Sequence, residues 1–294
     1  MFLTICLNPT IQKTLSFPSV VSGAVNRTPA HRLDASGKGV NVTRVLNQLE
    51  KKAVHLTHLG GVMRPLFLSL CEQDNLPVEW VESNSDIRFC YTVINESDSS
   101  VTELVEESHP IGADTEERLL ENFNRLIKDN YCLIISGTKA AGYSDTVIPT
   151  MVCKAKEKGL RVILDIKGND LIESLKYKPD IIKPNYVEFT ATFKNEPAKE
   201  TLIEISRKYK CRIVLTNGSQ NILAADNENF FKIDVKPVKA INTTGCGDAF
   251  TAGFASALEN TKADYNKEFL LAAINEGMRC GSLNAGLVRP GVIR

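Results

Sequence analysis

Short apolar runs alternate along the chain with longer segments in which apolar residues recur every three or four positions. The runs are rich in β-branched residues and cover positions 4–7, 133–135, 162–166, 181–182 and 213–215. Continuous apolar runs of this length are typical of strands that are covered on both faces, as in a parallel sheet. The pattern therefore predicts buried strands at these places.

The segments between the runs show helical spacing. Within 144–158, apolar residues occur at positions 148, 151, 152 and 155, and Gly159 follows as a natural helix end. The same spacing recurs after Gly39 and after Asp248. Strand and helix in alternation favour one α/β domain over residues 1–294, with a doubly wound, mostly parallel sheet flanked by helices.

Two regions break this rhythm. Residues 88–107 contain two β-rich pieces around the polar segment 95–100, which predicts a β-hairpin. Residues 15–34 hold short alternating pieces interrupted by prolines and a glycine. We expect the segments near 12–35 and 88–107 to form a small β lid over the strand ends. The alternative is an edge hairpin without a moving part.

The composition narrows the function classes. The 294 residues include 35 Lys and Arg and 35 Asp and Glu, so the formal net charge is zero. A chain without a basic surplus is a poor candidate for binding nucleic acid or anionic lipid. The eight cysteines form no C-x-x-C pair, and no apolar run is long enough to span a bilayer. Because the amino terminus also lacks a basic leader, we expect a cytoplasmic protein without a membrane or nucleic-acid partner.

The strongest chemical signal is the segment 242–250, Asn-Thr-Thr-Gly-Cys-Gly-Asp-Ala-Phe, which follows a β-like run and predicts a helix that opens at Ala249. Small residues before a helix leave backbone N–H groups free at the positive end of the helix dipole, where a polyphosphate can bind. Asp248 gains nothing from a neighbouring phosphate, but it can accept the proton of an attacking hydroxyl in phosphoryl transfer. The alternative is an aspartate that only begins a helix after a glycine turn.

A second glycine turn, Ala-Ser-Gly-Lys-Gly-Val-Asn-Val at 35–42, also leads into a helix. It lacks the spacing of a P-loop and of a dinucleotide fingerprint. Such a turn lets a polyhydroxylated ligand approach the backbone at Gly37, while Asn41 offers both a donor and an acceptor. The alternative is an ordinary tight turn that leaves Lys38 in solvent.

Together these two motifs resemble the signatures of the ribokinase-like (PfkB) carbohydrate kinase family, and the resemblance covers essentially the whole chain. Further segments are similar to family motifs: Asn8-Pro9-Thr10-Ile11, Ser136-Gly137-Thr138, Lys183-Pro184-Asn185-Tyr186-Val187-Glu188 and Thr216-Asn217-Gly218. Residues 23–27, Lys38 and residues 284–290 look most like the branch of 1-phosphofructokinase and tagatose-6-phosphate kinase.

The resemblance implies transfer of the γ-phosphoryl group of ATP to a sugar hydroxyl. Asp248 would act as the base, and the site of developing negative charge would be lined by the amides of Gly245, Cys246 and Gly247. Mg²⁺ would be oriented, through waters, by Asn185 and Glu188. The resemblance assigns ATP contacts to Lys183, Asn185, Thr216, Gly218 and Asn284. It assigns substrate contacts to Gln12, Arg27, Gly37, Lys38, Asn41 and Arg88.

Three of the substrate contacts are cations, Arg27, Lys38 and Arg88, which would hold the phosphate already present on the substrate. Gln12 departs from the family pattern, because this branch has an aspartate there that hydrogen-bonds sugar hydroxyls. The longer, neutral Gln must pair with a hydroxyl in a different way. Cys246 also replaces a small residue. A thiol at a helix start can have a lowered pKa, but we expect this one only to fill space.

The expected function is an ATP-dependent phosphosugar kinase that converts fructose 1-phosphate into fructose 1,6-bisphosphate. Tagatose 6-phosphate, fructose 6-phosphate and an unphosphorylated sugar are alternative substrates, and a catalytically impaired sugar-phosphate-binding protein is the alternative of another class. The resemblance also implies that the lid edges can pair two copies into a homodimer. A serine hydrolase is excluded, since the sequence has no G-x-S-x-G motif and its four histidines show no partner pattern.

Overall fold

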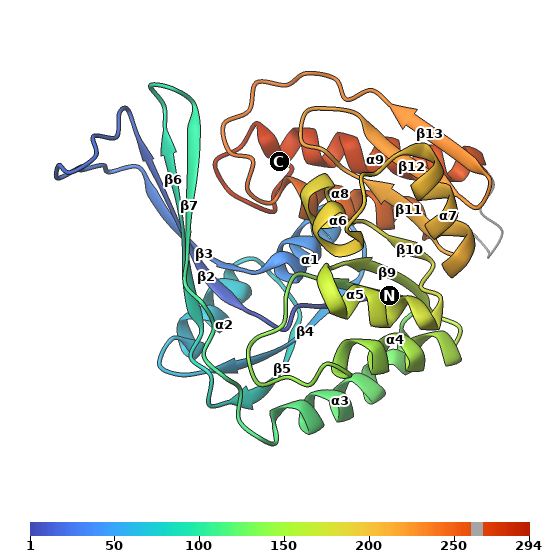
Figure 1. Ribbon diagram of the computed structural model, residues 1–294. Coiled ribbons are helices and arrows are strands. Elements are labelled where there is room, and N and C mark those ends of the chain that lie inside the picture. Colours follow the sequence, from blue (N-terminus) through green and yellow to red (C-terminus); the bar gives the residue numbers. More distant parts are fainter. Residues whose placement is uncertain (260–266) are drawn as a thin grey trace.

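The predicted apolar runs become strands of a nine-stranded sheet in the described residues, 1–259 and 267–294, of the computed structural model (Figure 1). The strands of this main sheet are β1 (Phe2–Ile5), β4 (Ala53–Gly60), β5 (Val78–Ser83), β8 (Cys132–Ser136), β9 (Arg161–Asp165), β10 (Ile181–Ile182), β11 (Arg212–Leu215), β12 (Ile222–Asp226) and β13 (Asn229–Ile233). Every side chain of β1 and β8 is buried, because helices cover both faces. This double cover explains why these runs are apolar almost throughout instead of alternating.

The strand order of the main sheet is β13-β12-β11-β10-β9-β8-β1-β4-β5. Neighbouring strands from β11 to β5 are parallel, whereas β12 and β13 form an antiparallel edge. The chain passes from β1 to β4 on one side and later continues at β8 on the other side of β1. The predicted doubly wound, mostly parallel sheet is therefore confirmed, and its switch point lies between β1 and β8. In such folds ligands bind at the carboxyl ends of the strands near the switch point.

Helices lie on both faces of the main sheet (Figure 1). One face packs against α1 (Lys38–Gln48), α8 (Cys246–Ala257) and α9 (Lys267–Ala285). The opposite face packs against α3 (Thr115–Leu126), α4 (Val147–Glu157), α5 (Gly168–Ser174), α6 (Tyr186–Phe193) and α7 (Lys199–Tyr209). Short 3₁₀ turns follow α3 and α5, at Ile127–Asp129 and Leu175–Tyr177. No helix in the described part of the chain is both long and apolar enough to cross a membrane.

A second, smaller sheet projects from the main body (Figure 1). Its strand order is β3-β2-β6-β7, with bounds β3 (His31–Ser36), β2 (Thr10–Phe17), β6 (Arg88–Asn95) and β7 (Ser100–Val105). The antiparallel pairing of β6 with β7 confirms the predicted hairpin. α2 (Arg64–Gln73) packs against the base of this sheet, where Ile11, Ala35 and Phe67 share one apolar cluster.

The register of the small sheet decides which side chains turn toward the main body. Gln12 lies opposite Asp34 on β3, and Thr92 lies opposite Glu103 on β7. Gln12 and Thr92 share one face, since the Nε2 atom of Gln12 donates a hydrogen bond to the hydroxyl of Thr92. From this face Glu103 reaches the loop before α8, where its carboxylate accepts a hydrogen bond from Thr244. The polar row on the small sheet therefore faces the carboxyl edge of the main sheet.

One predicted boundary is wrong: α8 begins at Cys246, not at Ala249. The cause is Gly245, whose φ of +83° turns the chain directly before the helix. Cys246 and Gly247 then already have helical conformation, and Asp248 becomes the third residue of the helix. The small residues of this motif therefore form the first helical turn itself instead of a loop in front of it.

Candidate active site

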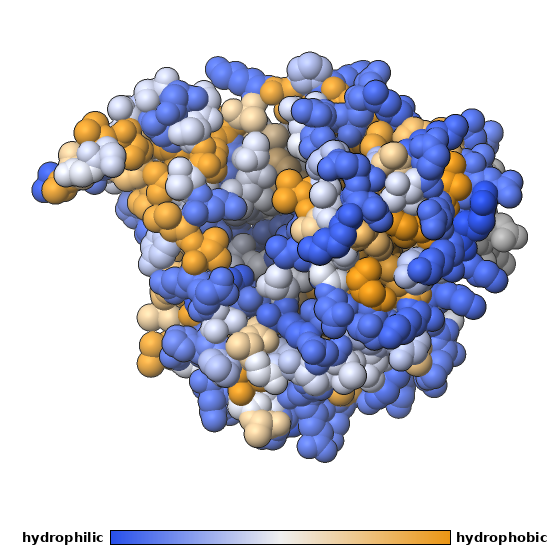
Figure 2. Space-filling model, viewed as in Figure 1, coloured by the Kyte–Doolittle hydropathy of each residue, from blue (hydrophilic) through white to orange (hydrophobic). Residues whose placement is uncertain are grey.

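The predicted site residues come largely from the carboxyl ends of the parallel strands. At the switch point, the Nδ2 atom of Asn8 after β1 donates to the hydroxyl of Thr138 after β8, at 3.2 Å. The space-filling view shows a recess between the small sheet and the main body (Figure 2). The N-termini of α1 and α8 begin at this edge, each preceded by a glycine with positive φ, Gly37 at 115° and Gly245 at 83°.

The start of α8 leaves backbone donors free. No side chain caps this helix, and within the described residues the amides of Gly245 and Gly247 have no hydrogen-bond acceptor. The amide of Cys246 turns back to the carbonyl of Thr243 at 3.3 Å. Space at the two glycines differs: a Cβ at Gly245 would lie 2.8 Å from the backbone nitrogen of Gly291, whereas one at Gly247 would meet only the Nζ atom of Lys183, at 3.9 Å. The first turn of α8 therefore offers uncompensated N–H groups beside open space.

Asp248 projects from this turn but does not cap its own helix. Its side chain is buried, and its Oδ2 atom accepts a hydrogen bond of 2.8 Å from the Nδ2 atom of Asn41 on α1. Burial raises the pKa of Asp248 to about 7, while the positive charge of Lys38 and the Asn41 hydrogen bond act in the opposite direction. A carboxylate with a pKa near neutrality is well suited to accept a proton.

Two lysines and two further acids surround Asp248. The Nζ atom of Lys38 lies 3.1 Å from Oε1 of Glu188 and 3.7 Å from Oδ1 of Asp165. The Nζ atom of Lys183 lies 3.3 Å from Oδ2 of Asp165. Burial of the Lys38 ammonium opposes its charged form, but the carboxylates of Asp165, Glu188 and Asp248 outweigh this effect, so the net shift of its pKa is upward. Lys38 therefore stays cationic; its side chain is 38% exposed, but its ammonium is held by two carboxylates instead of lying free in solvent.

Asp165 is a component of this site that the sequence analysis missed. It ends β9, is 1% exposed, and accepts hydrogen bonds from Ser136 and Thr251. Burial opposes ionisation of this carboxyl, but Lys183 and Lys38 outweigh it and lower its pKa. The available signal was an acidic residue inside the apolar run 162–166, at the place where a strand ends at the ligand edge.

The start of α6 holds the two predicted metal residues. The Oδ1 atom of Asn185 accepts from the amide of Glu188 at 2.8 Å, and the Oε2 atom of Glu188 accepts from the amide of Asn185 at 3.0 Å. This reciprocal pair is a capping box. Among the described residues, no three His, Cys, Asp or Glu side chains form a group that could hold a metal ion. The oxygens of Asn185 and Glu188 fit Mg²⁺ that is held through its own waters, because Mg²⁺ needs few direct protein ligands.

The other predicted nucleotide residues have different surroundings. Thr216 follows β11, and its carbonyl accepts from the amide of Tyr186 at the start of α6. Gly218 has a φ of +56° and open space around it. Asn284 is fully buried, donates to the carbonyls of Arg289 and Val292, and lies beneath Gly245, where its Oδ1 atom would be 3.1 Å from an added Cβ. The structure thus places Asn284 as a support for the turn before α8.

Among the predicted substrate residues of the small sheet, Gln12 and Arg88 lie near the strand ends of the main sheet, whereas Arg27 does not. Gln12 is buried in the polar row of the small sheet, and Arg88 begins β6, where its Nη1 atom donates to the carbonyl of Glu106 at 2.9 Å. Arg88 is near enough to the strand ends to lower the pKa of the Cys6 thiol, although burial dominates and raises that pKa overall. Arg27 lies apart from them, exposed in the loop between β2 and β3, without a hydrogen bond or ion pair to the described residues.

Cys246 has an environment that opposes reactivity. Burial is the main cause that raises the pKa of its thiol to about 12, and the charge of Asp248 acts in the same direction. Its Sγ atom faces the carbonyl of Asn242 at 3.8 Å. A protonated thiol is a poor nucleophile, so this surrounding agrees with the space-filling role expected for Cys246.

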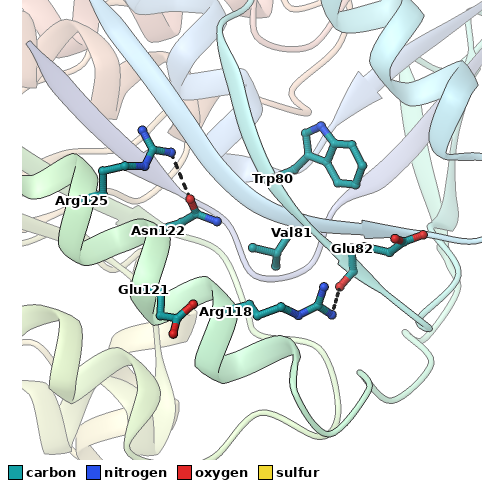
Figure 3. Close-up of a pocket in the computed structure, with 7 residues that line it drawn as sticks. All are labelled: Trp80, Val81, Glu82, Arg118, Glu121, Asn122 and Arg125. Carbon is teal, nitrogen blue, oxygen red and sulfur yellow. Dashed lines mark hydrogen bonds between the residues drawn. The ribbon is translucent and has the colours of Figure 1, made fainter.

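A surface pocket between β5 and α3 lies away from these residues (Figure 3). Its lining contains none of the predicted site residues; it consists of Trp80, Val81, Glu82, Arg118, Glu121, Asn122 and Arg125. Arg118 donates to the backbone carbonyl of Glu82 and pairs with Asp114, and Arg125 pairs with Glu79. Because both arginines of this hollow are already paired, the uncompensated donors at the strand ends mark the better candidate site.

Comparisons with known proteins bear on the family and the fold of this chain. The family model described as pfkB family carbohydrate kinase matches residues 2–286. Phosphofructokinase-2 from Escherichia coli in complex with potassium has a TM-score of 0.86 and 25% sequence identity, over 97% of this chain and 93% of that chain. The same enzyme in complex with substrates and products has a TM-score of 0.85 and 25% identity, over 97% and 92%. A protein described as a possible 1-phosphofructokinase from Thermotoga maritima shares the fold, with a TM-score of 0.86 and 18% identity over 98% and 92%.

Proposed function

Because the chain belongs to the pfkB family of carbohydrate kinases, we propose that it transfers the γ-phosphoryl group of ATP to a hydroxyl of a ketohexose phosphate. Fructose 1-phosphate, which would give fructose 1,6-bisphosphate, is the substrate that we favour from the residues at 23–27, 38 and 284–290. Similarity to phosphofructokinase-2 supports a phosphofructokinase activity in the broader sense and leaves fructose 6-phosphate and tagatose 6-phosphate as alternatives.

The observation that carries the proposal is the position of Asp248 in the first turn of α8. Its carboxylate lies in the same turn as the free amides of Gly245 and Gly247. Oδ2 is held by Asn41, while Oδ1 has no hydrogen-bond partner among the described residues. In the proposed reaction Asp248 takes the proton of the acceptor hydroxyl, whose oxygen bonds to the γ-phosphorus as the bond to the leaving ADP oxygen breaks.

The backbone and the lysines would stabilise the charge that develops during this transfer. Free N–H groups at a helix N-terminus favour an anion, and in a site with little water they are worth more than in solution. Lys38 is fixed between Asp165 and Glu188 and adds a positive charge at the same edge. When bound, Mg²⁺ would neutralise phosphate oxygens, and Glu188 and Asn185 would hold it through waters.

The cations of the small sheet support a substrate that already carries a phosphate. Arg88 stands at the start of β6, where this sheet meets the strand ends, and Arg27 lies in the exposed loop between β2 and β3. If the small sheet acts as a lid over the recess, its closure would bring Arg27 closer to the phosphate. The hydrogen bond between Glu103 and Thr244 already joins this sheet to the loop before α8.

Gln12 supports the alternative that catalysis is impaired. Its amide is bound to Thr92, so it presents a neutral group where related kinases have a carboxylate. Gln12→Asp places a carboxylate directly opposite Asp34. We expect this change to alter the sugar preference or the turnover rate, measured on the same sugar panel as the wild type. No change in either would show that position 12 does not contact the substrate.

An ADP-release assay over a panel of free and phosphorylated ketohexoses tests the function directly. We expect turnover with a ketohexose phosphate and weak activity on free fructose. Arg88→Ala should raise KM for the phosphosugar far more than for ATP, whereas Arg64→Ala, on the surface start of α2, should change neither. Equal increases of both KM values would assign Arg88 a folding role, and the absence of turnover across the panel would favour the binding-protein alternative.

We also propose that two copies pair through the small sheet. Apolar side chains gather on the part of this sheet that projects from the body (Figure 2), and Val25 and Leu104 are 76% and 56% exposed. Leu104→Asp should convert a dimer into a monomer in sedimentation velocity. The control Val187→Asp alters an equally apolar residue on α6, 75% exposed, and should leave the assembly unchanged. A wild-type monomer would contradict the pairing.

A further inference from the structure

Arg44 on α1 is a buried cation that the proposed function leaves without a role. It lies one helical turn after Asn41 and is 3% exposed. Its guanidinium is fixed from three directions: Nε lies 2.9 Å from Oδ2 of Asp74, Nη2 donates to the carbonyl of Ala35 at 2.5 Å, and Nη1 donates to Oδ1 of Asn41 at 2.8 Å. A guanidinium presents its donors in a rigid plane, so the contacts with Asp74 and Ala35 fix the direction in which Nη1 points, toward Asn41.

The contact with Arg44 determines how the Asn41 amide is oriented. The Oδ1 atom of Asn41 accepts from Arg44 and from the hydroxyl of Ser36 at 3.3 Å, so the amide nitrogen must point the other way. There it donates to Oδ2 of Asp248 at 2.8 Å. If the amide rotated by half a turn, its oxygen would face the Asp248 carboxylate and its NH₂ group would face the guanidinium. Both contacts would then be repulsive.

The C-terminal segment closes the remaining side of the amide. A Cβ at Gly291 would lie 2.8 Å from Cβ of Asn41 and 2.9 Å from its Oδ1 atom. Gly291 has a φ of +68°, so the chain can pass this closely only with a glycine. Arg289, two residues earlier, pairs with Asp34 and with Asp74, the acid that also anchors Arg44. The Asn41 amide is therefore enclosed by α1, α8 and the C-terminal segment.

We propose that Arg44 is a positioning residue for phosphoryl transfer: by fixing the Asn41 amide, it holds one oxygen of Asp248 and leaves the other directed at the acceptor hydroxyl. This inference rests on the proposed role of Asp248 as the base. Without Arg44, the Asn41 amide can rotate and the carboxylate of Asp248 loses its fixed donor. A base that samples several orientations is less often in the geometry that proton transfer requires.

A purely structural role for Arg44 is the competing explanation, because its ion pair with Asp74 is also buried. The two explanations predict different effects of an Arg44 substitution on the pKa of Asp248. A hydrogen bond donated to the ionised form of a carboxyl lowers its pKa, so loss of the fixed donor raises it. Asp74→Asn disturbs the same ion pair and removes a negative charge instead, so its electrostatic effect on Asp248 has the opposite sign.

Other charged and titratable groups face Asp248 and stay in place in these variants. They are Lys38 from α1, Asp165 from the end of β9, Lys183 after β10, the Cys6 thiol after β1 and the Cys246 thiol on α8. Lys38 and Asp165 are ionised across the neutral range, since their ion pair raises the pKa of Lys38 and lowers that of Asp165. Both thiols have raised pKa values and remain neutral there. A titration near pH 7 at this site therefore belongs to Asp248.

The decisive experiment measures the protonation of Asp248 in two ways. The first is the acid limb of kcat/KM, and the second is a ¹³C NMR titration of aspartate carboxyls, in which Asp248→Asn identifies the signal. We expect Arg44→Met to raise the apparent pKa by roughly one unit and to lower kcat more than it raises KM for ATP. Arg44→Lys keeps a buried cation without the planar fork and should show the same direction. Asp74→Asn should not raise the pKa.

A double-mutant cycle with Asn41→Ala tests whether Arg44 acts through Asn41. If it does, Arg44→Met adds no further pKa shift once the amide is absent. An equal shift in both backgrounds would show a direct charge effect and overturn the proposal, as would no shift in the single variant. The NMR titration does not depend on turnover. Failure of every sugar to react would therefore count against the proposed function, while the pKa comparison would still decide the role of Arg44.

Discussion

The helices α6 and α8 both begin at the carboxyl edge of the main sheet and carry an acid three residues after the N-cap, yet they use it differently. In α6, Glu188 folds back and accepts from the amide of its N-cap, Asn185. In α8, the N-cap is Gly245, and Asp248 turns away to Asn41 on another helix. One acid satisfies its own helix, and the other leaves the first-turn amides free.

The difference separates what stabilises the fold from what is available to a ligand. A capping box satisfies two donors that would otherwise lack a partner, and thereby stabilises the helix start. An uncapped start with a buried carboxyl does the opposite, because the free amides and the desolvated acid both cost stability. Such a costly arrangement is expected at a functional site, where a ligand supplies the missing partners. The comparison therefore points to α8 as the centre of the chemistry, with α6 in support.

The largest effect should come from replacing the acid of α8 by its amide. Asp248→Asn should lower kcat on the order of 10³-fold, because the proposed general base is lost, while ATP binding stays near normal. Single-turnover kinetics and ATP titration measure the two quantities. The matched change in α6, Glu188→Gln, keeps an oxygen that can accept from the Asn185 amide and should have a much smaller effect on kcat. If the two variants lost activity equally, the contrast between the helices would be wrong.

A large effect is also expected from pH. Because the pKa of Asp248 is raised to about 7, the proposed base is protonated in acid, so kcat/KM should fall about tenfold per pH unit below 7. Stability should respond in the opposite direction. Because the folded-state pKa lies above the ordinary value of 3.8, the stabilisation from the protonated carboxyl is complete below about pH 4 and is lost as the pH rises through 7.

Chemical denaturation at several pH values checks the stability part of this prediction. Asp248→Asn lacks the titrating group, so the wild type should lose stability relative to this variant between pH 4 and 7. The difference between their free energies of unfolding should change by up to a few kcal/mol over that range. Above pH 7 the difference should be constant. A difference that does not depend on pH would show that the carboxyl is not desolvated in the way its burial indicates.

The sequence predicted the layers of the fold better than the contacts of the site. Apolar runs such as those of β1 and β9 have one explanation, burial on both faces, and the helical spacing of α4 is equally direct. The start of α8 was predicted too late in the chain, because the sequence shows Gly245 but not its positive φ. Asp165 was missed because its importance comes from Lys38 and Lys183, which only the folded sheet brings to it.

The acid of α6 shows a second reason why sequence patterns left the site open. The segment Asn185 to Glu188 has the spacing of a capping box and of the family's metal segment at once. Local sequence cannot separate the two, since both need an oxygen at the same spacing. The structure shows the cap directly and also adds the contact of Glu188 with Lys38. The family signature and the local helix signal therefore describe the same two residues.

An intermediate effect is expected from the glycines at the start of α8. Gly245→Ala should destabilise the protein by about 1–3 kcal/mol, because its φ is positive and the added Cβ would lie 2.8 Å from the Gly291 nitrogen. Gly247→Ala has helical conformation and open space, so its stability should be unchanged or slightly higher. Thermal unfolding gives both values. Gly247→Ala should nevertheless raise KM for ATP if phosphates occupy that space, and an unchanged KM would place them elsewhere.

The smallest effect should come from removing the cap of α6. Asn185→Ala loses the side chain that accepts from the Glu188 amide at 2.8 Å, and a lost N-cap costs about 1 kcal/mol. Asn185→Ser restores an acceptor at the N-cap and should recover most of that stability in denaturant unfolding. The two variants also separate the two uses of this residue. If Asn185 serves only as a cap, KM for ATP and the Mg²⁺ dependence of kcat should recover in the Ser variant together with stability. If the Asn185 amide also orients a water of the metal, both kinetic quantities should stay impaired in the Ser variant although its stability has returned.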